Sequence, residues 1–467
     1  MQDLKKTIVA ISTAPVKAAI SIIRLSGQDA FSIINKLIKF DINQRPANSF
    51  KLLKIYDIKK TQLLDEVVVL VYKKPNSFTG ENMIEINCHG GVYLTYQILQ
   101  NLIAAGACLA LKGEFLQRAW FNNKINLIQA ESINALIEAK NEFQHQTSLK
   151  ILEHKSLYDL DLLSERVNNL IAQIEINIDY PEYEEAIPIR KPKILSVIDE
   201  MLKITSKIID ESEKIIKLNK GIKIAIIGAP NVGKSSLLNA LVNEEKAIVS
   251  KYKGTTRDII EGEINLRSLT LRLLDSAGIR QTKNKIELIG IKKAKHLSQN
   301  ADLVLLVIDG LKMKKEKEIN SEILQFLEDQ KIPFLVVLNK KDLFNINDFQ
   351  IPDFLLKYQT KNRLVFISSL KKDLDELLNW IENAFILENI QLKNTNLEFL
   401  QTNHQLGILK QINNILKETK MKEEIFEYYD LLAEPFHEIF DKINQLYGRN
   451  VKTDIVDFLF RNYCLGK

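Results

Sequence analysis

A glycine-rich segment in the middle of the chain carries the residue types that bind phosphate groups. Residues 228–235 read GAPNVGKS, which matches the pattern GxxxxGK[ST], and they follow the apolar run Ile222–Ile227. In this pattern the glycines let backbone N–H groups turn toward phosphates at the N-terminus of a helix. The ammonium of Lys234 would reach the β- and γ-phosphates, and the hydroxyl of Ser235 would ligate Mg²⁺. The segment predicts a site for a nucleoside triphosphate.

Three further motifs follow in order along the chain and indicate which nucleotide binds. Thr256, in the sequence GTTRD, offers a hydroxyl to the metal, and Asp275 begins the sequence DSAG at the end of an expected strand. Asp275 would contact the ligands of Mg²⁺ rather than the ion itself, with the amide of Gly278 near the γ-phosphate. Asp342 closes the sequence NKKD. Its carboxylate can accept hydrogen bonds from guanine N1–H and the exocyclic amine, a pair of donors that adenine cannot offer, so the motifs predict GTP.

The loop that would support the guanine base is a poorer match. Ser368, Ser369 and Leu370 stand where a Ser-Ala-Lys sequence is usual. With the motifs above, this loop completes the residues that we expect to bind GTP. They are Asn231, Val232, Gly233, Lys234, Ser235, Ser236, Asp275, Ser276, Ala277, Gly278, Asn339, Lys340, Asp342, Ser368 and Ser369.

Hydrolysis of GTP is a separate question, because the position after Gly278 holds Ile279. Ras-like proteins place a glutamine there, which orients the attacking water. Isoleucine cannot do so, which leaves two alternatives: a switch that binds GTP with negligible turnover, or hydrolysis by another polar group together with a cation. For the second alternative, Arg280 and Glu287 lie just downstream, and Asn231 offers an oxygen that could help to hold a monovalent cation beside the phosphates.

Short apolar strands that alternate with helices would position these motifs. The expected strands are Ile222–Ile227, Leu269–Leu274, Leu303–Ile308, Phe334–Leu338 and Leu364–Ile367. Such alternation from 222 to about 380 implies a parallel sheet that is covered on both faces. We therefore expect a Ras-like α/β P-loop GTPase domain.

The segments on either side of this region have different secondary-structure patterns. Residues 1 to about 120 read as an α+β domain, with strand-like runs at Thr7–Ile11, Ala19–Leu25, Glu66–Tyr72 and Met83–Asn87. Residues 124–216 and those after 380 have helical periodicity. The last helical stripe is made of Leu432, Phe436, Ile439, Ile443 and Leu446. Pro435 lies inside that stripe and should kink or reset the helix.

The differences in secondary-structure pattern along the chain predict a multidomain protein. The expected parts are an N-terminal α+β domain over 1–120, a first helical part over 121–216, the G domain over 217–380 and a second helical part over 381–467. An α/β domain flanked by helical segments suggests insertion into a helical domain whose two parts pack together.

Composition limits the function further. The net charge of +5 on 467 residues permits a nucleic-acid partner without requiring one, because a clustered basic patch is what marks such a surface. The chain has three cysteines without the spacing of a metal site, which indicates a reducing compartment. No signal peptide pattern and no continuous apolar run of about 18 residues is present. We therefore expect a cytoplasmic protein without a membrane span.

Several motifs together resemble the tRNA modification GTPase MnmE (TrmE) family over the whole chain. In the N-terminal part these are residues 7–11, 22–27, 75–91 and 113–124. Residues 129–131 resemble the opening of the family's helical domain, and residues 464–467, Cys-Leu-Gly-Lys, resemble its Cys-Ile-Gly-Lys terminus. The resemblance implies a folate-binding-like N-terminal domain that mediates homodimerisation and binds a one-carbon donor of the 5-formyltetrahydrofolate type. Its folate contacts would be Arg24, Glu85, Lys124 and Lys467.

The resemblance also implies that GTP is turned over. G domains of this family dimerise across the nucleotide with K⁺ bound, and the matching K⁺ residues here are Asn231, Ser250, Tyr252 and Thr255. Glu287 matches the catalytic glutamate that positions water, and Arg280 matches an arginine of the same loop, so both are candidate catalytic residues. Mg²⁺ would be held by Ser235 and Thr256. With the FAD-dependent partner MnmG (GidA), such proteins install an aminomethyl or carboxymethylaminomethyl group on C5 of the wobble uridine of certain tRNAs.

Other positions leave questions open. Cys464 is a candidate nucleophile for uridine activation, with a packing role as the alternative. The sequence departs from the family pattern at Val16–Ala19 on the folate side and at Leu370 beside the base. The competing function is a ribosome-assembly GTPase switch of the Era or Der type. It would be marked by a KH-like GXXG domain or a second P-loop, and the sequence contains neither. A scaffold that binds GTP without turnover is the third alternative.

Overall fold

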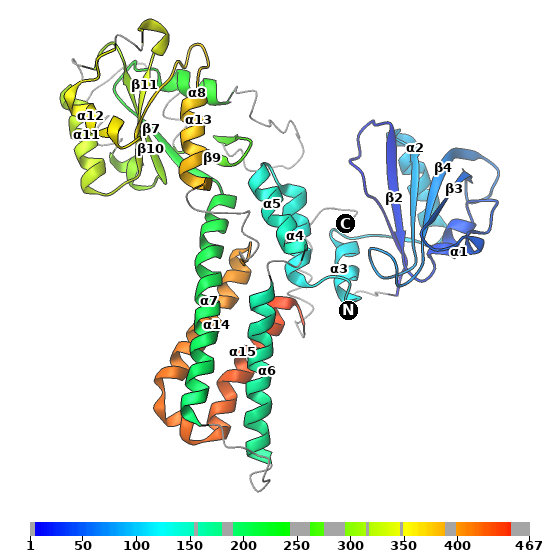
Figure 1. Ribbon diagram of the computed structural model, residues 1–467. Helices are drawn as coiled ribbons and strands as arrows, with labels where there is room; N and C mark the ends of the chain where they lie inside the picture. Colours follow the sequence, from blue (N-terminus) through cyan, green and yellow to red (C-terminus); the bar gives the residue numbers. More distant parts are fainter. Residues whose placement is uncertain are drawn as a thin grey trace. The chain divides into compact units, whose positions relative to one another are not determined.

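A computed structural model describes residues 5–153, 157–179, 190–242, 262–274, 295–313, 317–345, 349–387 and 398–449. The described residues form two compact units (Figure 1). One unit is drawn from 1–134, 160–205 and 407–467, and the other from 135–159 and 206–406. The chain therefore passes between the units more than once, and each unit combines segments that are distant in the sequence.

The N-terminal part of the first unit is a six-stranded sheet with the strand order β3-β4-β5-β2-β1-β6. Its strands are β1 (Ile8–Ile11), β2 (Ile20–Ser26), β3 (Ser49–Tyr56), β4 (Leu63–Tyr72), β5 (Met83–His89) and β6 (Cys108–Leu109). Only β1 and β6 pair in parallel. Helices α1 (Ala30–Asn35), α2 (Val92–Ala104) and α3 (Glu114–Phe121) and the 3-10 turn η1 (Ile42–Gln44) complete this part.

Alternation of side chains along the strands puts the core on one face of this sheet. In β4, Val67, Val69 and Val71 are fully buried and the residues between them are only half-buried. These valines pack with residues of α1 and α2 in one apolar cluster. Because successive side chains of a strand point to opposite faces, the other face carries the polar side chains of β2 and β5 that are described below.

The helical region consists of four long helices, two before the inserted sheet and two after it. They are α6 (Tyr158–Asp179), α7 (Lys191–Asn219), α14 (Asn403–Met421) and α15 (Tyr429–Tyr447). Figure 1 shows α14 beside α7 and α15 beside α6. A buried hydrogen bond of 2.7 Å from Asn413 Nδ2 to Thr205 Oγ1 links residues 208 positions apart. Tyr447 Oη donates to Asp161 Oδ1 at 2.5 Å. The expected packing of the two helical parts is confirmed.

The expected effect of Pro435 on its helix is wrong in part. The stripe of Leu432, Phe436, Ile439, Ile443 and Leu446 is buried as predicted. However, α15 continues through Pro435 without a break. The proline leaves the carbonyl of Leu431, four residues earlier, without its helical donor. Leu431 is 50% exposed, so water can satisfy that carbonyl and the helix need not be reset.

The inserted region contains a second six-stranded sheet with the order β12-β11-β10-β7-β9-β8. Its strands are β7 (Ile222–Ile227), β8 (Glu263–Asn265), β9 (Thr270–Leu273), β10 (Leu303–Asp309), β11 (Phe334–Asn339) and β12 (Leu364–Phe366). Its helices are α8 (Lys234–Val242), α11 (Lys317–Asp329), α12 (Asp353–Thr360) and α13 (Asp375–Glu382), with the 3-10 turn η2 (Lys341–Leu343) and a π-helical turn at Asn383–Leu387. Every residue of β10 and β11 is buried, so the sheet is covered on both faces.

The predicted fold class is confirmed, with one correction to the second sheet. It is not wholly parallel, because β8 pairs antiparallel with β9 at the sheet edge. The domain limits stay predictions, and α7 and α13 run across the limits proposed at 216/217 and 380/381. Among the described residues, no helix is both long enough and apolar enough to span a membrane.

Two shorter helices follow α3, and the second of them contacts the β8–β9 hairpin within its unit. They are α4 (Leu127–Glu138) and α5 (Glu142–Leu152). Asn141 caps α5 by accepting from the amide of Gln144 at 2.9 Å, and its Nδ2 donates to Thr270 Oγ1 at 3.0 Å. The amide of Glu142 donates to the carbonyl of Arg267, in the hairpin turn, at 2.8 Å. Helix α5 is therefore bonded to the hairpin through both backbone and side-chain atoms.

Candidate functional site

The glycine-rich loop connects β7 to α8 in the conformation that its residues predict. Gly228, Asn231 and Gly233 have φ angles of +146°, +66° and +102°, a region that glycine and asparagine adopt most readily. Lys234 is the first residue of α8. Its ammonium donates to the carbonyls of Gly228 at 2.9 Å and Ala229 at 2.7 Å. The loop is thus wrapped around its own lysine at a helix N-terminus, where backbone N–H groups favour anions.

Asn339 connects the glycine-rich loop to the two loops expected to bind the base. Asn339 is 2% exposed, and its Nδ2 donates to the carbonyl of Val232 at 2.9 Å. Its Oδ1 accepts from the amide of Lys340 at 2.8 Å and from both the amide and the hydroxyl of Ser369 at 3.0 Å. Three of the predicted motifs are therefore joined by one buried amide.

Gly233 allows this connection and offers a direct test of it. A Cβ added at Gly233 would lie 2.2 Å from Asn339 Nδ2, and the φ of +102° is strained for any side chain. We expect Gly233→Ala to lower the affinity for GTP about tenfold, because backbone strain of this kind costs roughly 1–3 kcal/mol. Equilibrium titration of the full chain with a fluorescent GTP analogue measures this. Unchanged affinity in Gly233→Ala would contradict the geometry, and Gly407→Ala, where an added Cβ meets nothing within 4 Å, is the control.

Asp342 and Ser368 meet at the expected base-binding loops. The hydroxyl of Ser368 donates to Asp342 Oδ1 at 2.5 Å, and this hydrogen bond lowers the pKa of the carboxyl. Asp342 is therefore ionised at neutral pH, as it must be to accept from two guanine N–H groups. Leu370, which stands at the position of the usual lysine, is 82% exposed.

Asp309 is a supporting residue that the motif analysis missed. It ends the buried strand β10, is 1% exposed, and its Oδ2 lies 2.6 Å from the ammonium of Lys340. Its Oδ1 accepts from the amide of Leu311 at 3.0 Å. The carboxylate thus orients the lysine of the guanine motif. The signal available in the sequence was a charged residue that directly follows the apolar run 303–308.

Several predicted site residues lie outside the described residues, and their roles stay predictions. They are Ser250, Tyr252, Thr255, Thr256, Asp275, Ser276, Ala277, Gly278, Arg280, Glu287, Cys464 and Lys467. The described members of the GTP set are Asn231, Val232, Gly233, Lys234, Ser235, Ser236, Asn339, Lys340, Asp342, Ser368 and Ser369. The structure brings the glycine-rich loop, the guanine motif and the 368–369 loop together at one end of the sheet.

A second cluster of polar residues lies on the N-terminal sheet. Arg24 of β2 and Glu85 of β5 are paired in register, and Arg24 donates to Glu85 Oε1 from Nε at 2.9 Å and from Nη2 at 2.7 Å. Each side chain is 15% exposed. Tyr72 Oη donates to Glu85 Oε2 at 3.4 Å, and burial together with the charge of Glu85 raises the pKa of this phenol. The rings of Phe78 and Phe115 lie 5.3 and 5.6 Å from the Arg24 guanidinium.

Lys124, the third predicted folate contact, approaches the same region from the end of α3. Its amide donates to the carbonyl of Ala119 at 2.8 Å, and its side chain is exposed. The stem of Lys124 packs on Gly80, where an added Cβ would lie 3.2 Å from Cγ. Gly80 belongs to the same loop as Phe78, so a single loop contacts both Lys124 and Arg24. The structure therefore brings Arg24, Glu85 and Lys124 together around the loop 77–81.

Two family models match separate parts of the chain. The model described as GTP-binding protein TrmE N-terminus matches residues 7–124, which contain the N-terminal sheet. The model described as 50S ribosome-binding GTPase matches residues 223–340, within the nucleotide-binding region alone.

Curated relatives match the chain from end to end. A tRNA modification GTPase MnmE of Mesoplasma florum is 39% identical over 468 residues, covering 100% of both chains. The protein of the same name from Ureaplasma parvum serovar 3 is 38% identical, over 99% of this chain and 100% of its own. The one from Mycoplasma genitalium is 35% identical, over 98% and 99%. Since identity at this level extends along the whole of each chain, this chain belongs to the family of tRNA modification GTPases MnmE.

Proposed function

We propose that this chain is a K⁺-stimulated GTPase that modifies C5 of the wobble uridine of certain tRNAs in the cytoplasm. It acts as a homodimer with the FAD-dependent partner MnmG (GidA), and it installs an aminomethyl or carboxymethylaminomethyl group using a one-carbon unit of the 5-formyltetrahydrofolate type. Hydrolysis of GTP in tRNA modification follows from membership of the family. The K⁺ dependence, the MnmG partner, the homodimer and the folate donor are proposed in addition to this activity.

The observation that carries the GTPase part is the buried amide of Asn339. It joins the glycine-rich loop at Val232 to Lys340 and Ser369 with bonds of 2.8 to 3.0 Å. A loop that turns its N–H groups toward phosphates is thereby held at a set distance from a carboxylate, Asp342, that selects guanine. This arrangement supports binding of a guanine nucleotide with both ends recognised.

The residues present suit the two proposed cations. Mg²⁺ prefers oxygen ligands, and Ser235 and Thr256 would supply hydroxyl oxygens. K⁺ would be held by Asn231, Ser250, Tyr252 and Thr255, each of which can supply an oxygen atom to the cation. When bound, the cations neutralise charge that develops on the phosphates. Glu287 would orient the attacking water, and Arg280 would support the same loop.

The N-terminal cluster suits a folate by its chemistry. Glu85 offers carboxylate oxygens to the N–H groups of a pterin, and Arg24, Lys124 and Lys467 offer cations to the carboxylates of the glutamyl tail. The rings of Phe78 and Phe115 give Arg24 apolar neighbours, and its side chain is only 15% exposed. A partly desolvated cation binds an anionic ligand more strongly than a fully hydrated one.

The tRNA assignment is tested by the modified nucleosides themselves. We expect cells that lack the gene to lose the aminomethyl-type groups at the wobble uridine, and cells that regain the intact gene to recover them. Mass spectrometry of nucleosides from purified tRNA measures both. A Lys234→Ala copy should fail to restore them, because it removes the cation that contacts the phosphates. An unchanged nucleoside profile in the deletion strain would end the assignment.

A further inference from the structure

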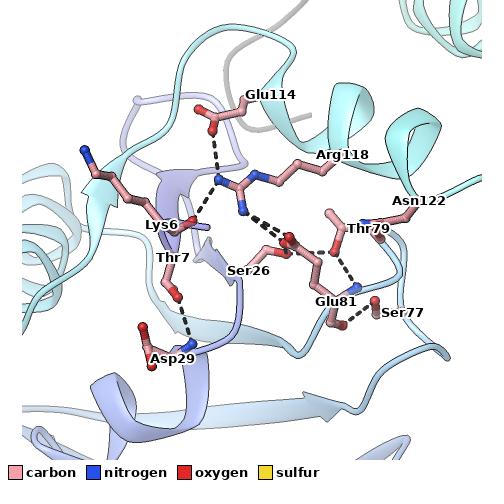
Figure 2. Close-up of polar contacts among 10 residues, drawn as sticks. All are labelled: Lys6, Thr7, Ser26, Asp29, Ser77, Thr79, Glu81, Glu114, Arg118 and Asn122. Carbon is pink, nitrogen blue, oxygen red and sulfur yellow. Dashed lines mark hydrogen bonds and ion pairs between the residues drawn. The ribbon is translucent and has the colours of Figure 1, made fainter. Parts of the chain in front are cut away.

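A buried arginine joins two elements of the N-terminal cluster. Arg118 in α3 is 1% exposed, and Figure 2 shows its guanidinium between Glu81, Glu114 and the carbonyl of Lys6. Its Nη1 donates to both carboxylate oxygens of Glu81 at 3.1 Å. Its Nη2 donates to the Lys6 carbonyl at 2.8 Å and to Glu114 Oε1 at 3.0 Å. One side chain thus connects the loop 77–81 to the first turn of α3.

Both carboxylates are held by further hydrogen bonds and cannot easily turn away. Glu81 Oε2 accepts from the hydroxyl of Ser26 at 2.7 Å, and that hydroxyl lies 2.7 Å from Thr79 Oγ1. Glu114 Oε2 accepts from the amide of Leu111 at 2.8 Å. The planar fork of an arginine suits such fixed acceptors, because its five N–H groups point in set directions. The network therefore determines how far the loop lies from the helix.

The loop and the helix that Arg118 connects are the elements that surround the proposed folate contacts. Phe78 of the loop and Phe115 of the helix are the two rings that pack on Arg24. The stem of Lys124 packs on Gly80 of the same loop. A change in the separation of loop and helix would therefore move the neighbours of both cations.

We propose that Arg118, acting with Glu81, is a positioning residue for the one-carbon donor site. In this role it acts through the loop and the helix: Phe78 and Phe115 of these two elements pack on Arg24, and Gly80 of the loop packs on Lys124. The inference rests on the proposed folate function. Lysine cannot replace Arg118 in this role, because a single ammonium lacks the fork that contacts Glu81 and Glu114 together.

The test is equilibrium binding of 5-formyltetrahydrofolate to the full chain, measured by isothermal titration calorimetry. We expect Arg118→Lys to weaken binding about tenfold or more, because a contact residue misplaced by about 1 Å loses much of its effect. Glu81→Gln should weaken binding in the same direction. The control is Arg45→Lys, the same exchange in the same domain, where the guanidinium donates to the carbonyl of Phe50. It should bind like the wild type.

A second measurement separates positioning from a purely structural role. Thermal unfolding of each variant shows whether it is folded at the temperature of the titration. In an Arg24→Ala background, Arg118→Lys should cause little further loss, because residues that act through one another are not additive. A role in the fold alone would instead lower the melting temperature and leave binding by the folded protein unchanged.

The outcomes are distinguishable from failure of the proposed function. If the wild-type chain binds and folded Arg118→Lys binds equally well, the inference is wrong and the folate assignment stands. If Arg118→Lys does not fold, Glu81→Gln decides the question by the same comparison. If the wild-type chain gives no binding, the folate assignment itself is wrong, and the inference with it.

Discussion

Asp342→Asn is expected to lower the affinity for GTP about 100-fold, since roughly 3 kcal/mol is lost when two charge-assisted hydrogen bonds are disrupted. The carboxylate of Asp342 can accept from guanine N1–H and from the exocyclic amine, whereas the asparagine amide would present a donor to that amine. Xanthine carries an oxygen in place of the amine, so the variant should bind xanthosine triphosphate better than the wild type does. Competition titrations with both nucleotides measure the change.

A gain in affinity for xanthosine triphosphate would distinguish a change in base recognition from general damage to the site. The Ser368 hydroxyl can still donate to the amide oxygen of an asparagine at position 342, so the loop should keep its shape. Asp353→Asn removes the same charge from an exposed position at the start of α12 and serves as the control. Weaker binding of GTP with no gain for xanthosine triphosphate would count against Asp342 as the residue that reads the base.

Glu287→Ala should lower the rate of GTP hydrolysis about 100-fold or more while GTP still binds, since the side chain that positions the attacking water would be lost. The reason is the isoleucine at position 279, which cannot orient water, so that another polar group must do so. Single-turnover hydrolysis gives the chemical rate, and nucleotide titration gives the affinity. Glu318→Ala, at an exposed position in α11, is the matched control.

The dependence of the hydrolysis rate on the monovalent cation gives a second test of the same mechanism. In the wild-type chain the rate in K⁺ should exceed that in Na⁺ about tenfold or more, because a correctly held cation stabilises charge on the transferred phosphate. Glu287→Ala should reduce the rate in both salts. Equal rates in the two salts for the wild type would refute the K⁺ mechanism, and a normal rate in Glu287→Ala would refute the role of the glutamate.

Local signals made the second sheet predictable in most of its strands. The run Ile222–Ile227 is mostly apolar and β-branched and is followed by Gly228, and β7 has the same limits. Strand β8 was missed because it has three residues, one of them Glu263, and exists only by pairing with β9. Strand β3 was not predicted because its exposed face carries apolar side chains. Phe50 and Leu52 are 69% and 59% exposed, so apolar residues occupy the face where polar ones are expected.

The candidate sites likewise contain residues that local motifs predict and residues that they do not. Lys234 and Asp342 were found because their motifs are contiguous, and the geometry that a motif needs is set by a few neighbouring residues. The pair of Asp309 and Lys340 spans 31 positions, and the pair of Glu81 and Arg118 spans 37. No local pattern relates such residues, because tertiary packing alone brings them together. The motifs predicted the GTP site, the family resemblance supplied the folate contacts and the K⁺ residues, and the structure added residues that support these sites.

The attachment of α5 to the β8–β9 hairpin affects how the nucleotide-binding part should be isolated for biophysical work. A contiguous fragment of residues 217–380 would omit Asn141 and Glu142, the partners of Thr270 and of the hairpin turn. Thr270 is 3% exposed in the whole chain, and in such a fragment its hydroxyl would lose the hydrogen bond from Asn141 Nδ2. Kinetics from the fragment would then describe an enzyme with one edge of its sheet unsupported. A split design, with residues 135–159 supplied as a separate peptide or grafted through a linker, would retain that edge.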